Sequence, residues 1–173
     1  ATFGRVYTGI NVGTGSTVNN LSTGTIHATE YGVYGDDDTV ISNAGLIDVN
    51  DGYGIYGDGD NNSITNSGTI IAYDKGIQTY HNSTVINTLT GEVFADEYFG
   101  IQVSQDGYVE NQGLVYSDNK GIKTAYNGVV LNSGTIAAYE IGILAAGDEN
   151  VVTNSGSIGG DGTAYLPTDT APY

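Results

Sequence analysis

Two acidic clusters are the residues of this sequence best suited to binding a metal ion. The first is the run Asp36, Asp37 and Asp38, and the second contains Asp58 and Asp60 in a segment rich in Gly and Asn. Carboxylate oxygens on flexible loops are ligands that Ca²⁺ accepts. The chain lacks both the Gly-Gly-x-Gly-x-Asp repeat and the EF-hand loop. The sequence therefore predicts Ca²⁺ as a candidate cofactor, with a solvated acidic loop as the alternative.

A second group of side chains combines tyrosines with carboxylates, spaced by roughly one repeat. Its members are Tyr31, Tyr53, Tyr73 and Tyr98, together with Glu30, Asp51 and Asp74. Aromatic rings beside hydrogen-bonding groups suit contacts with sugar rings or with another protein. We expect these residues to form a surface binding strip. The alternative is ordinary strand packing, because tyrosine is common in half-exposed strands.

No set of residues in the sequence matches a known catalytic motif. His27 and His81 stand alone, and the sequence contains neither a cysteine nor a Gly-x-Ser-x-Gly elbow. Asp48, Asp51 and Asp74 could supply the carboxylate pair of a glycoside-cleaving enzyme. The loops at the corners of the repeats, however, are too short and uniform to form the walls of a substrate-binding cleft. We expect a protein that is not an enzyme, with a carbohydrate-binding or polysaccharide-degrading β-helix as the alternative.

These side chains are positioned by a repeat of about 22 residues. The same short phrase recurs around a glycine, as in Ser67-Gly-Thr-Ile and Ser133-Gly-Thr-Ile. The phrase glycines are Gly24, Gly45, Gly68, Gly91, Gly113, Gly134 and Gly156, in steps of 21 to 23 residues. Such a period is typical of a solenoid, in which each repeat packs on its neighbours.

Each repeat contains three short segments with β-branched residues in register. The segment after the phrase glycine carries an inward column of Ile and Val, such as Ile47 and Ile70, beside a column of small residues. A second glycine column precedes the next segment and is predicted to form a corner that needs positive φ or close backbone approach. It consists of Gly9, Gly32, Gly54, Gly76, Gly100, Gly121 and Gly142.

The third segment ends in a column of asparagines, which we expect to form an internal amide ladder. Its members are Asn20, Asn43, Asn66, Asn87, Asn111, Asn132 and Asn154. Together the columns predict an all-β fold, a right-handed parallel β-helix of about seven coils with three short strands per coil. It covers residues 1–158, with a partial first coil at 1–19, and residues 159–173 are predicted to form a cap or tail. A β-sandwich or barrel is the alternative.

The phrases Asn66-Ser-Gly-Thr-Ile and Asn132-Ser-Gly-Thr-Ile, each followed about ten residues later by Gly-Ile, resemble the β-helices of bacterial autotransporter passengers and related exported adhesins. The resemblance covers roughly residues 17–160. It implies a secreted or cell-surface protein that acts in adhesion or builds a surface layer or fibre. The partners expected from it are other copies of this chain or a surface glycan or protein.

Charge and hydropathy narrow the range of partners. The sequence has 20 acidic residues against four Lys and Arg, for a net charge of −16. Such a surface repels nucleic acid and anionic lipid. The sequence also contains no apolar run of about 18 residues. We therefore expect neither nucleic-acid binding nor membrane insertion.

Overall fold

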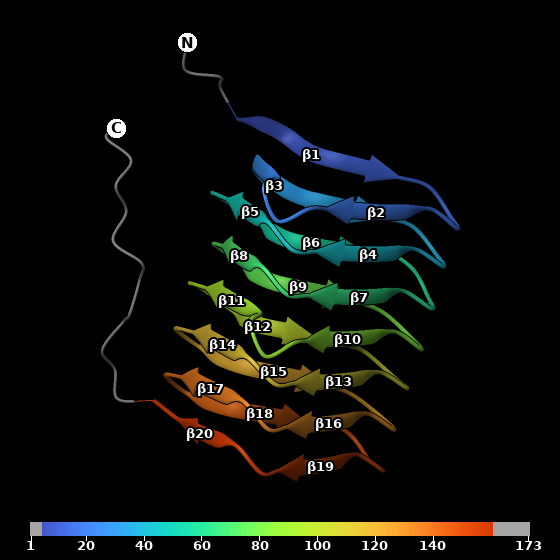
Figure 1. The fold of residues 1–173 in the computed structure, drawn as a ribbon. Coiled ribbons are helices and arrows are strands. Elements are labelled where there is room, and N and C mark those ends of the chain that lie inside the picture. Colours follow the sequence, from blue (N-terminus) through green and yellow to red (C-terminus); the bar gives the residue numbers. More distant parts are fainter. Residues whose placement is uncertain (1–4, 161–173) are drawn as a thin grey trace.

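The computed structural model describes residues 5–160, and every regular element within them is a β-strand. Figure 1 shows the strands stacked in successive right-handed coils, each coil directly above the next. Adjacent rungs of a sheet lie about 4.8 Å apart, so the stack of about seven coils forms a rod of about 30 Å. The predicted fold class is confirmed. Residues 161–173, most of the predicted cap or tail, lie outside the described residues.

Face A of the rod is a seven-stranded sheet formed by the third segment of each coil. Its strands are β2 (Thr17–Asn20), β4 (Val40–Asn43), β7 (Ser63–Asn66), β10 (Thr84–Asn87), β13 (Tyr108–Asn111), β16 (Val129–Asn132) and β19 (Val151–Asn154). Every pairing between them is parallel and keeps equivalent residues in register.

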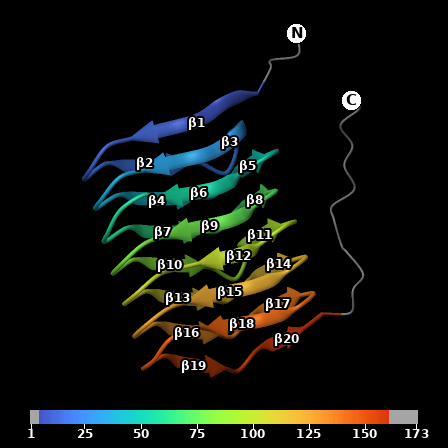
Figure 2. The same cartoon turned by 180° about the vertical axis from the view of Figure 1, so that it is seen from behind.

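Faces B and C form one thirteen-stranded sheet, because β3 (Thr25–Gly35) runs unbroken around the corner between them. Face B comprises the first part of β3, β5 (Leu46–Val49), β8 (Thr69–Ala72), β11 (Glu92–Ala95), β14 (Leu114–Ser117), β17 (Thr135–Ala138) and β20 (Ser157–Gly159). Face C comprises β1 (Val6–Val12), the second part of β3, β6 (Tyr53–Gly57), β9 (Lys75–Thr79), β12 (Phe99–Gln102), β15 (Lys120–Thr124) and β18 (Ile141–Ala145). Figure 2 shows the same stack from behind.

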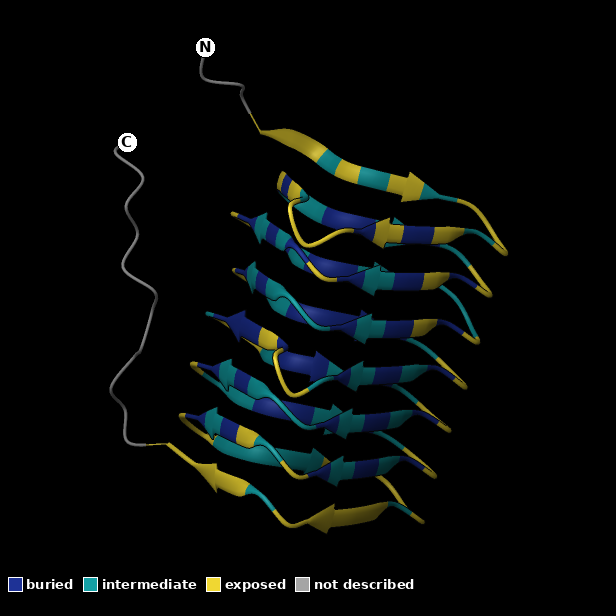
Figure 3. Ribbon diagram, viewed as in Figure 1, coloured by how far each residue is buried: buried dark blue, intermediate teal, exposed yellow. Residues whose placement is uncertain are grey.

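The predicted aliphatic columns fill the interior. Ile47, Ile55 and Ile64, one from each face of the same coil region, are all fully buried. The last coil is different, because Val152 and Ile158 belong to the same columns yet are 45% and 44% exposed. Figure 3 shows this coil exposed along β19 and β20, whereas the middle coils are buried. The core of the described residues is therefore open at its C-terminal end.

The second glycine column lies within the strands of face C and not in a corner as predicted, and close contact explains it. A Cβ on Gly54 would lie 2.2 Å from Cγ2 of Ile70 and 2.5 Å from the carbonyl oxygen of Gly76 in the next coil. Among the described glycines only Gly15 and Gly147 have positive φ, and neither belongs to this column. Of the two reasons considered from the sequence, the approach of neighbouring backbone is the one that applies.

The asparagine column forms the predicted ladder, and the ladder has a direction. Each Nδ2 donates to Oδ1 of the asparagine in the next coil at 2.7 to 2.9 Å, from Asn20 to Asn154. At the C-terminal end the amide of Asn154 donates, among residues 5–160, only to the carbonyl of Gly156 in its own coil. At the N-terminal end Oδ1 of Asn20 accepts from no described residue. The two ends therefore carry opposite hydrogen-bonding groups.

Candidate functional site

Face C carries a continuous cluster of tyrosines on its outer surface. The cluster consists of Tyr7, Tyr31, Tyr34, Tyr53, Tyr56 and Tyr80. Tyr31 stacks on Tyr53 with ring centroids 5.6 Å apart and planes 7° apart. Tyr34 and Tyr56, also on β3 and β6, have centroids 5.6 Å apart. Each such pair contributes about 0.5–1.5 kcal/mol beyond area burial, so the cluster is held together by its own contacts.

Two tyrosine hydroxyls converge on one carboxylate. Tyr34 donates to Oδ2 of Asp58, and Tyr56 donates to Oδ1 of Asp58 at 3.4 Å while its hydroxyl pairs with that of Tyr80 at 3.0 Å. The hydrogen bond to Asp58 raises the pKa of Tyr34 to about 12. Burial, and then the contact with Tyr80, raises the pKa of Tyr56. Both phenols therefore keep their protons at neutral pH.

The other half of face C carries all three lysines of the chain, Lys75, Lys120 and Lys123. The ammonium of Lys75 lies 5.0 Å from the ring centroid of Tyr53, and those of Lys120 and Lys123 lie 5.7 and 5.2 Å from the centroid of Phe99. No Asp or Glu occurs in β1, β6, β9, β12, β15 or β18, or in residues 31–35 of β3. Face C is thus aromatic and cationic in a strongly acidic chain.

The structure brings only part of the predicted binding strip together. Tyr31 and Tyr53 share a column, since each directly precedes the glycine of the second glycine column in its coil. Tyr73 and Tyr98 lie instead in the corners between faces B and C and are 44% and 46% exposed. They precede the glycine by three and two residues, which places them before the strand begins.

The predicted carboxylates Glu30, Asp51 and Asp74 occupy the corner between faces B and C and border the tyrosine cluster. Burial raises the pKa of Tyr31, and the charges of Glu30 and Asp74 raise it further. These acids therefore lie at the rim of face C and influence its phenols through space. They do not lie among the outward residues of its strands.

The predicted metal ligands Asp36, Asp37, Asp38, Asp58 and Asp60 do not gather into a site. Oδ1 of Asp37 accepts from the backbone N–H of Asp60 at 2.8 Å, and Oδ1 of Asp38 accepts from the amide of Asn61 at 3.0 Å. Within residues 5–160 no three His, Cys, Asp or Glu side chains are grouped so that they could hold a metal ion. Calcium binding stays a prediction from the sequence.

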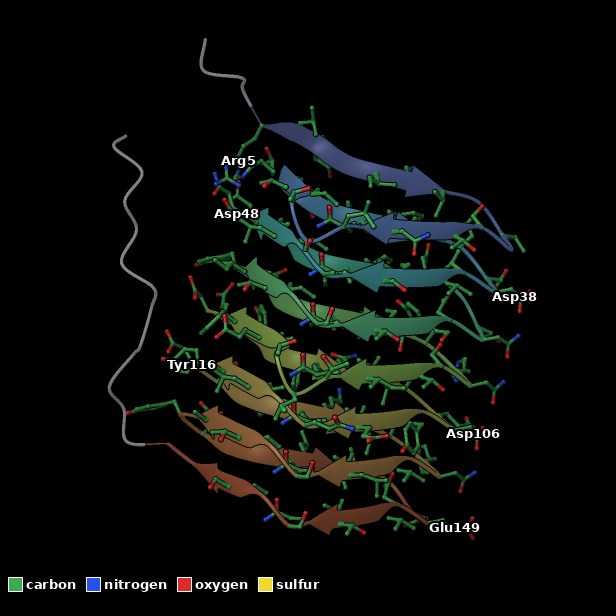
Figure 4. All side chains as sticks on the ribbon, viewed as in Figure 1. Arg5, Asp38, Asp48, Asp106, Tyr116 and Glu149 are labelled. Carbon is green, nitrogen blue, oxygen red and sulfur yellow. The ribbon has the colours of Figure 1, made fainter. Side chains whose placement is uncertain are left out.

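One position of this corner has a backbone requirement. The same position in successive coils has positive φ, between 53° and 62°. These residues are Asp38, Asn61, Asn82, Asp106, Asn127 and Glu149. Asp and Asn tolerate the left-handed region better than most residues. Figure 4 shows Asp38, Asp106 and Glu149 along one edge of the rod. Of the predicted metal ligands only Asp38 occupies this position, so the backbone requirement accounts for Asp38 and not for the other four.

Next to this edge lies an internal polar column that the sequence analysis missed. The side-chain oxygen of Asn62 accepts from the backbone N–H of Thr39 at 2.9 Å, and the hydroxyl of Ser83 accepts from the backbone N–H of Asn62 at 3.1 Å. All three residues are buried. The residue type at this position differs from coil to coil, so the column cannot be recognised from a repeated residue in the sequence.

One of the carboxylates considered for glycoside cleavage, Asp48, is hydrogen-bonded through its side chain. Asp48 is held by the guanidinium of Arg5 at 2.7 Å and by Nδ1 of His27 at 2.9 Å. Figure 4 shows Arg5 and Asp48 pointing toward each other. A shallow groove of about 390 Å³ lies beside Leu89 at the corner of faces A and B, and Glu92 is the one ionisable residue that lines it. A glycosidase needs two carboxyl groups across its cleft, which this groove does not supply.

Comparison with protein-family models, with curated proteins and with solved structures finds no match to this chain. The part of the chain that the structure describes holds no helix of the length and apolarity needed to cross a membrane. The class of protein shown is therefore a parallel β-solenoid repeat protein.

Proposed function

We propose that this chain is a non-catalytic structural rod that works outside the cell and extends end to end into a surface layer or fibre. The observation that carries the proposal is the open C-terminal coil. Its residues Val151, Val152 and Ile158 are 54%, 45% and 44% exposed, although they continue the inward and outward columns of the repeat. An open coil end offers unpaired backbone groups and apolar side chains that match a further coil.

The asparagine ladder supports the same proposal, because it makes the two ends complementary. Asn20 offers an acceptor at one end, and Asn154 offers amide hydrogens at the other. A second copy placed one rung beyond β19 and β20 continues the ladder and the aliphatic columns together. A head-to-tail contact of this kind repeats without closing, and its product is a filament.

Electron microscopy and light scattering of the purified chain over a range of concentrations test the proposal. We expect rods that lengthen with concentration. Val152→Lys and Ile158→Lys place charges in the open core and should keep the chain monomeric. Thr153→Lys, on the outward side of the same strand, should leave assembly intact. A wild-type chain that stays monomeric at every concentration would refute end-to-end assembly.

A second candidate function is attachment to a surface glycan through face C. It is favoured by the tyrosine cluster and the three lysines, which lie together on strands that contain no carboxylate. Binding to an array of neutral and acidic polysaccharides tests it, with a Tyr31→Ala, Tyr53→Ala double variant expected to lose binding. Tyr139→Ala is the matched control, since Tyr139 is 70% exposed and lies outside the face C strands. The same incubations should release no new reducing ends or unsaturated products, because neither proposal includes catalysis.

A further inference from the structure

Tyrosine is the side chain of this protein that a one-electron oxidant attacks. The chain has 14 tyrosines and contains no Cys, Met or Trp. The sulfur atoms of Cys and Met are the usual targets of oxidation in proteins, and the indole of Trp is another. In the absence of all three, the phenol rings are the groups from which an electron is most easily removed. Where those rings lie close together therefore determines where the oxidised product forms.

Tyr34 and Tyr56 occupy equivalent positions on adjacent coils. They are Cα partners in the β3–β6 pairing, and their ring centroids are 5.6 Å apart with planes inclined at 32°. Both side chains are half-buried, and neither belongs to the hydrophobic core. Two aromatic rings held in this way need only a small rotation to bring their ortho carbons together.

Asp58 provides the proton acceptor that phenol oxidation requires. Its two carboxylate oxygens receive the hydroxyls of Tyr34 and Tyr56 separately. Because both phenols are protonated at neutral pH, loss of an electron has to be accompanied by loss of a proton. A carboxylate already hydrogen-bonded to the hydroxyl accepts that proton without reorganisation, as a general base does.

We propose that Tyr34 and Tyr56 form an oxidative coupling site, with Asp58 as their shared proton acceptor, at which a dityrosine bond joins adjacent coils. The oxidant is hydrogen peroxide acting through a haem peroxidase. Each ring loses one electron to the oxidant, and each hydroxyl proton passes by way of Asp58 to water. The two phenoxyl radicals join through a bond between ortho carbons, and each ortho hydrogen then moves to its own ring oxygen. Two tyrosines and one hydrogen peroxide yield one dityrosine and two waters.

The rest of the cluster directs oxidation to this pair. Tyr31 lies 5.5 Å from Tyr34 and 5.5 Å from Tyr56 between ring centroids, and Tyr53 lies 5.1 Å from Tyr56. A radical formed on Tyr31 or Tyr53 can therefore be transferred to Tyr34 or Tyr56, the two tyrosines that are hydrogen-bonded to Asp58. The bond would act as a covalent staple between two coils and would stabilise them by restricting the unfolded chain, as a disulfide does.

The stacked pair Tyr31 and Tyr53 is a built-in control. It spans the same two strands, and its ring centroids are also 5.6 Å apart. Within the described residues neither hydroxyl is hydrogen-bonded to a carboxylate. If proximity alone decided the product, the two pairs would couple equally. If Asp58 matters, coupling concentrates on Tyr34 and Tyr56.

The test treats the full chain at low concentration with peroxidase and hydrogen peroxide. Dityrosine fluorescence, a mass lowered by two hydrogens and migration as a monomer on a denaturing gel identify the intramolecular product. We expect the Y34F/Y56F variant to lose most of this product and Y31F/Y53F to keep most of it. D58N keeps all the rings and should lower the yield, and the coupled wild type should melt at a higher temperature than the untreated chain.

The proposal is overturned if Y34F/Y56F gives as much intramolecular dityrosine as the wild type. It is equally overturned if D58N does not lower the yield, or if the product appears only in covalent dimers formed through exposed rings such as Tyr126 and Tyr139. Circular dichroism of each variant before treatment establishes that it is folded. Should a tyrosine variant fail to fold, D58N decides the result alone. None of these outcomes bears on end-to-end assembly or on glycan attachment.

Discussion

Replacing one asparagine in the middle of the ladder should destabilise the protein far more than the same replacement at its end. Asn66 receives the amide of Asn43 at 2.8 Å and donates to Oδ1 of Asn87 at 2.9 Å. It also donates to the carbonyls of Gly68 at 3.1 Å and Glu92 at 3.2 Å. Asn66 and Asn87 are fully buried, so water cannot replace the lost partners in Asn66→Ala.

The expected cost follows from the groups that are left without partners. Oδ1 of Asn87 loses its ladder donor, and the amide of Asn43 loses its best acceptor. A buried polar group without a partner costs about 1–3 kcal/mol, so the two together cost about 2–6 kcal/mol. At about 2–4 °C per kcal/mol for a chain of this size, the melting temperature should fall by about 4–24 °C.

Asn154→Ala is the matched control, because Asn154 lies at the exposed end of the same ladder. Only the amide of Asn132 loses an acceptor there, and it keeps weaker contacts with the carbonyls of Gly134 and Ser157. We expect a loss of about 1 kcal/mol. Thermal and urea unfolding followed by circular dichroism compare the two variants. Equal losses would show that the ladder does not stabilise the coils through buried hydrogen bonds.

Three further predictions concern the second glycine column, the tyrosine cluster and the acidic corner. Gly54→Ala should lower the free energy of unfolding, measured in urea, by about 1–3 kcal/mol or more, because the added Cβ would clash with Ile70 and Gly76. Gly13→Ala is the control and should be nearly neutral, because the nearest atom to its Cβ is 3.8 Å away. The hydrogen bond to Asp58 raises the pKa of Tyr34 from 10.0 to about 12, so its contribution to stability is complete below pH 10 and is lost as the pH rises through 12. The free energy of unfolding, measured as a function of pH, should show this loss in the wild type and a smaller loss in D58N. If the acidic corner binds Ca²⁺ as the sequence predicts, millimolar Ca²⁺ should raise the melting temperature by several degrees over that in EDTA. An unchanged melting temperature would refute the calcium prediction.

The sequence alone was sufficient to predict the coils and their core. Each strand alternates between inward and outward residues, so Ile41 and Ile64 could be assigned to the interior from their place in the repeat. The asparagine ladder was equally predictable, because the same residue recurs in seven coils. The open last coil was not, because Val152 and Ile158 have the same residue pattern as their buried equivalents. The burial of a residue depends on whether another coil packs on its own, and the residue type does not show this.

The candidate sites were decided by the tertiary structure. Tyr31 and Tyr53 directly precede Gly32 and Gly54 and lie on strands, whereas Tyr73 stands three residues before Gly76 and lies in the corner before the strand. Residues at different distances from the same glycine column occupy different places in the coil, and their side chains therefore do not share a face. The sequence by itself therefore determined the period, the interior columns and the asparagine ladder. Only the tertiary structure showed that Tyr34 and Tyr56 share Asp58 as a hydrogen-bond acceptor. Tyr34 belongs to one coil and Asp58 to the next, so this contact depends on how the coils stack and on the conformation of the corner that contains Asp58.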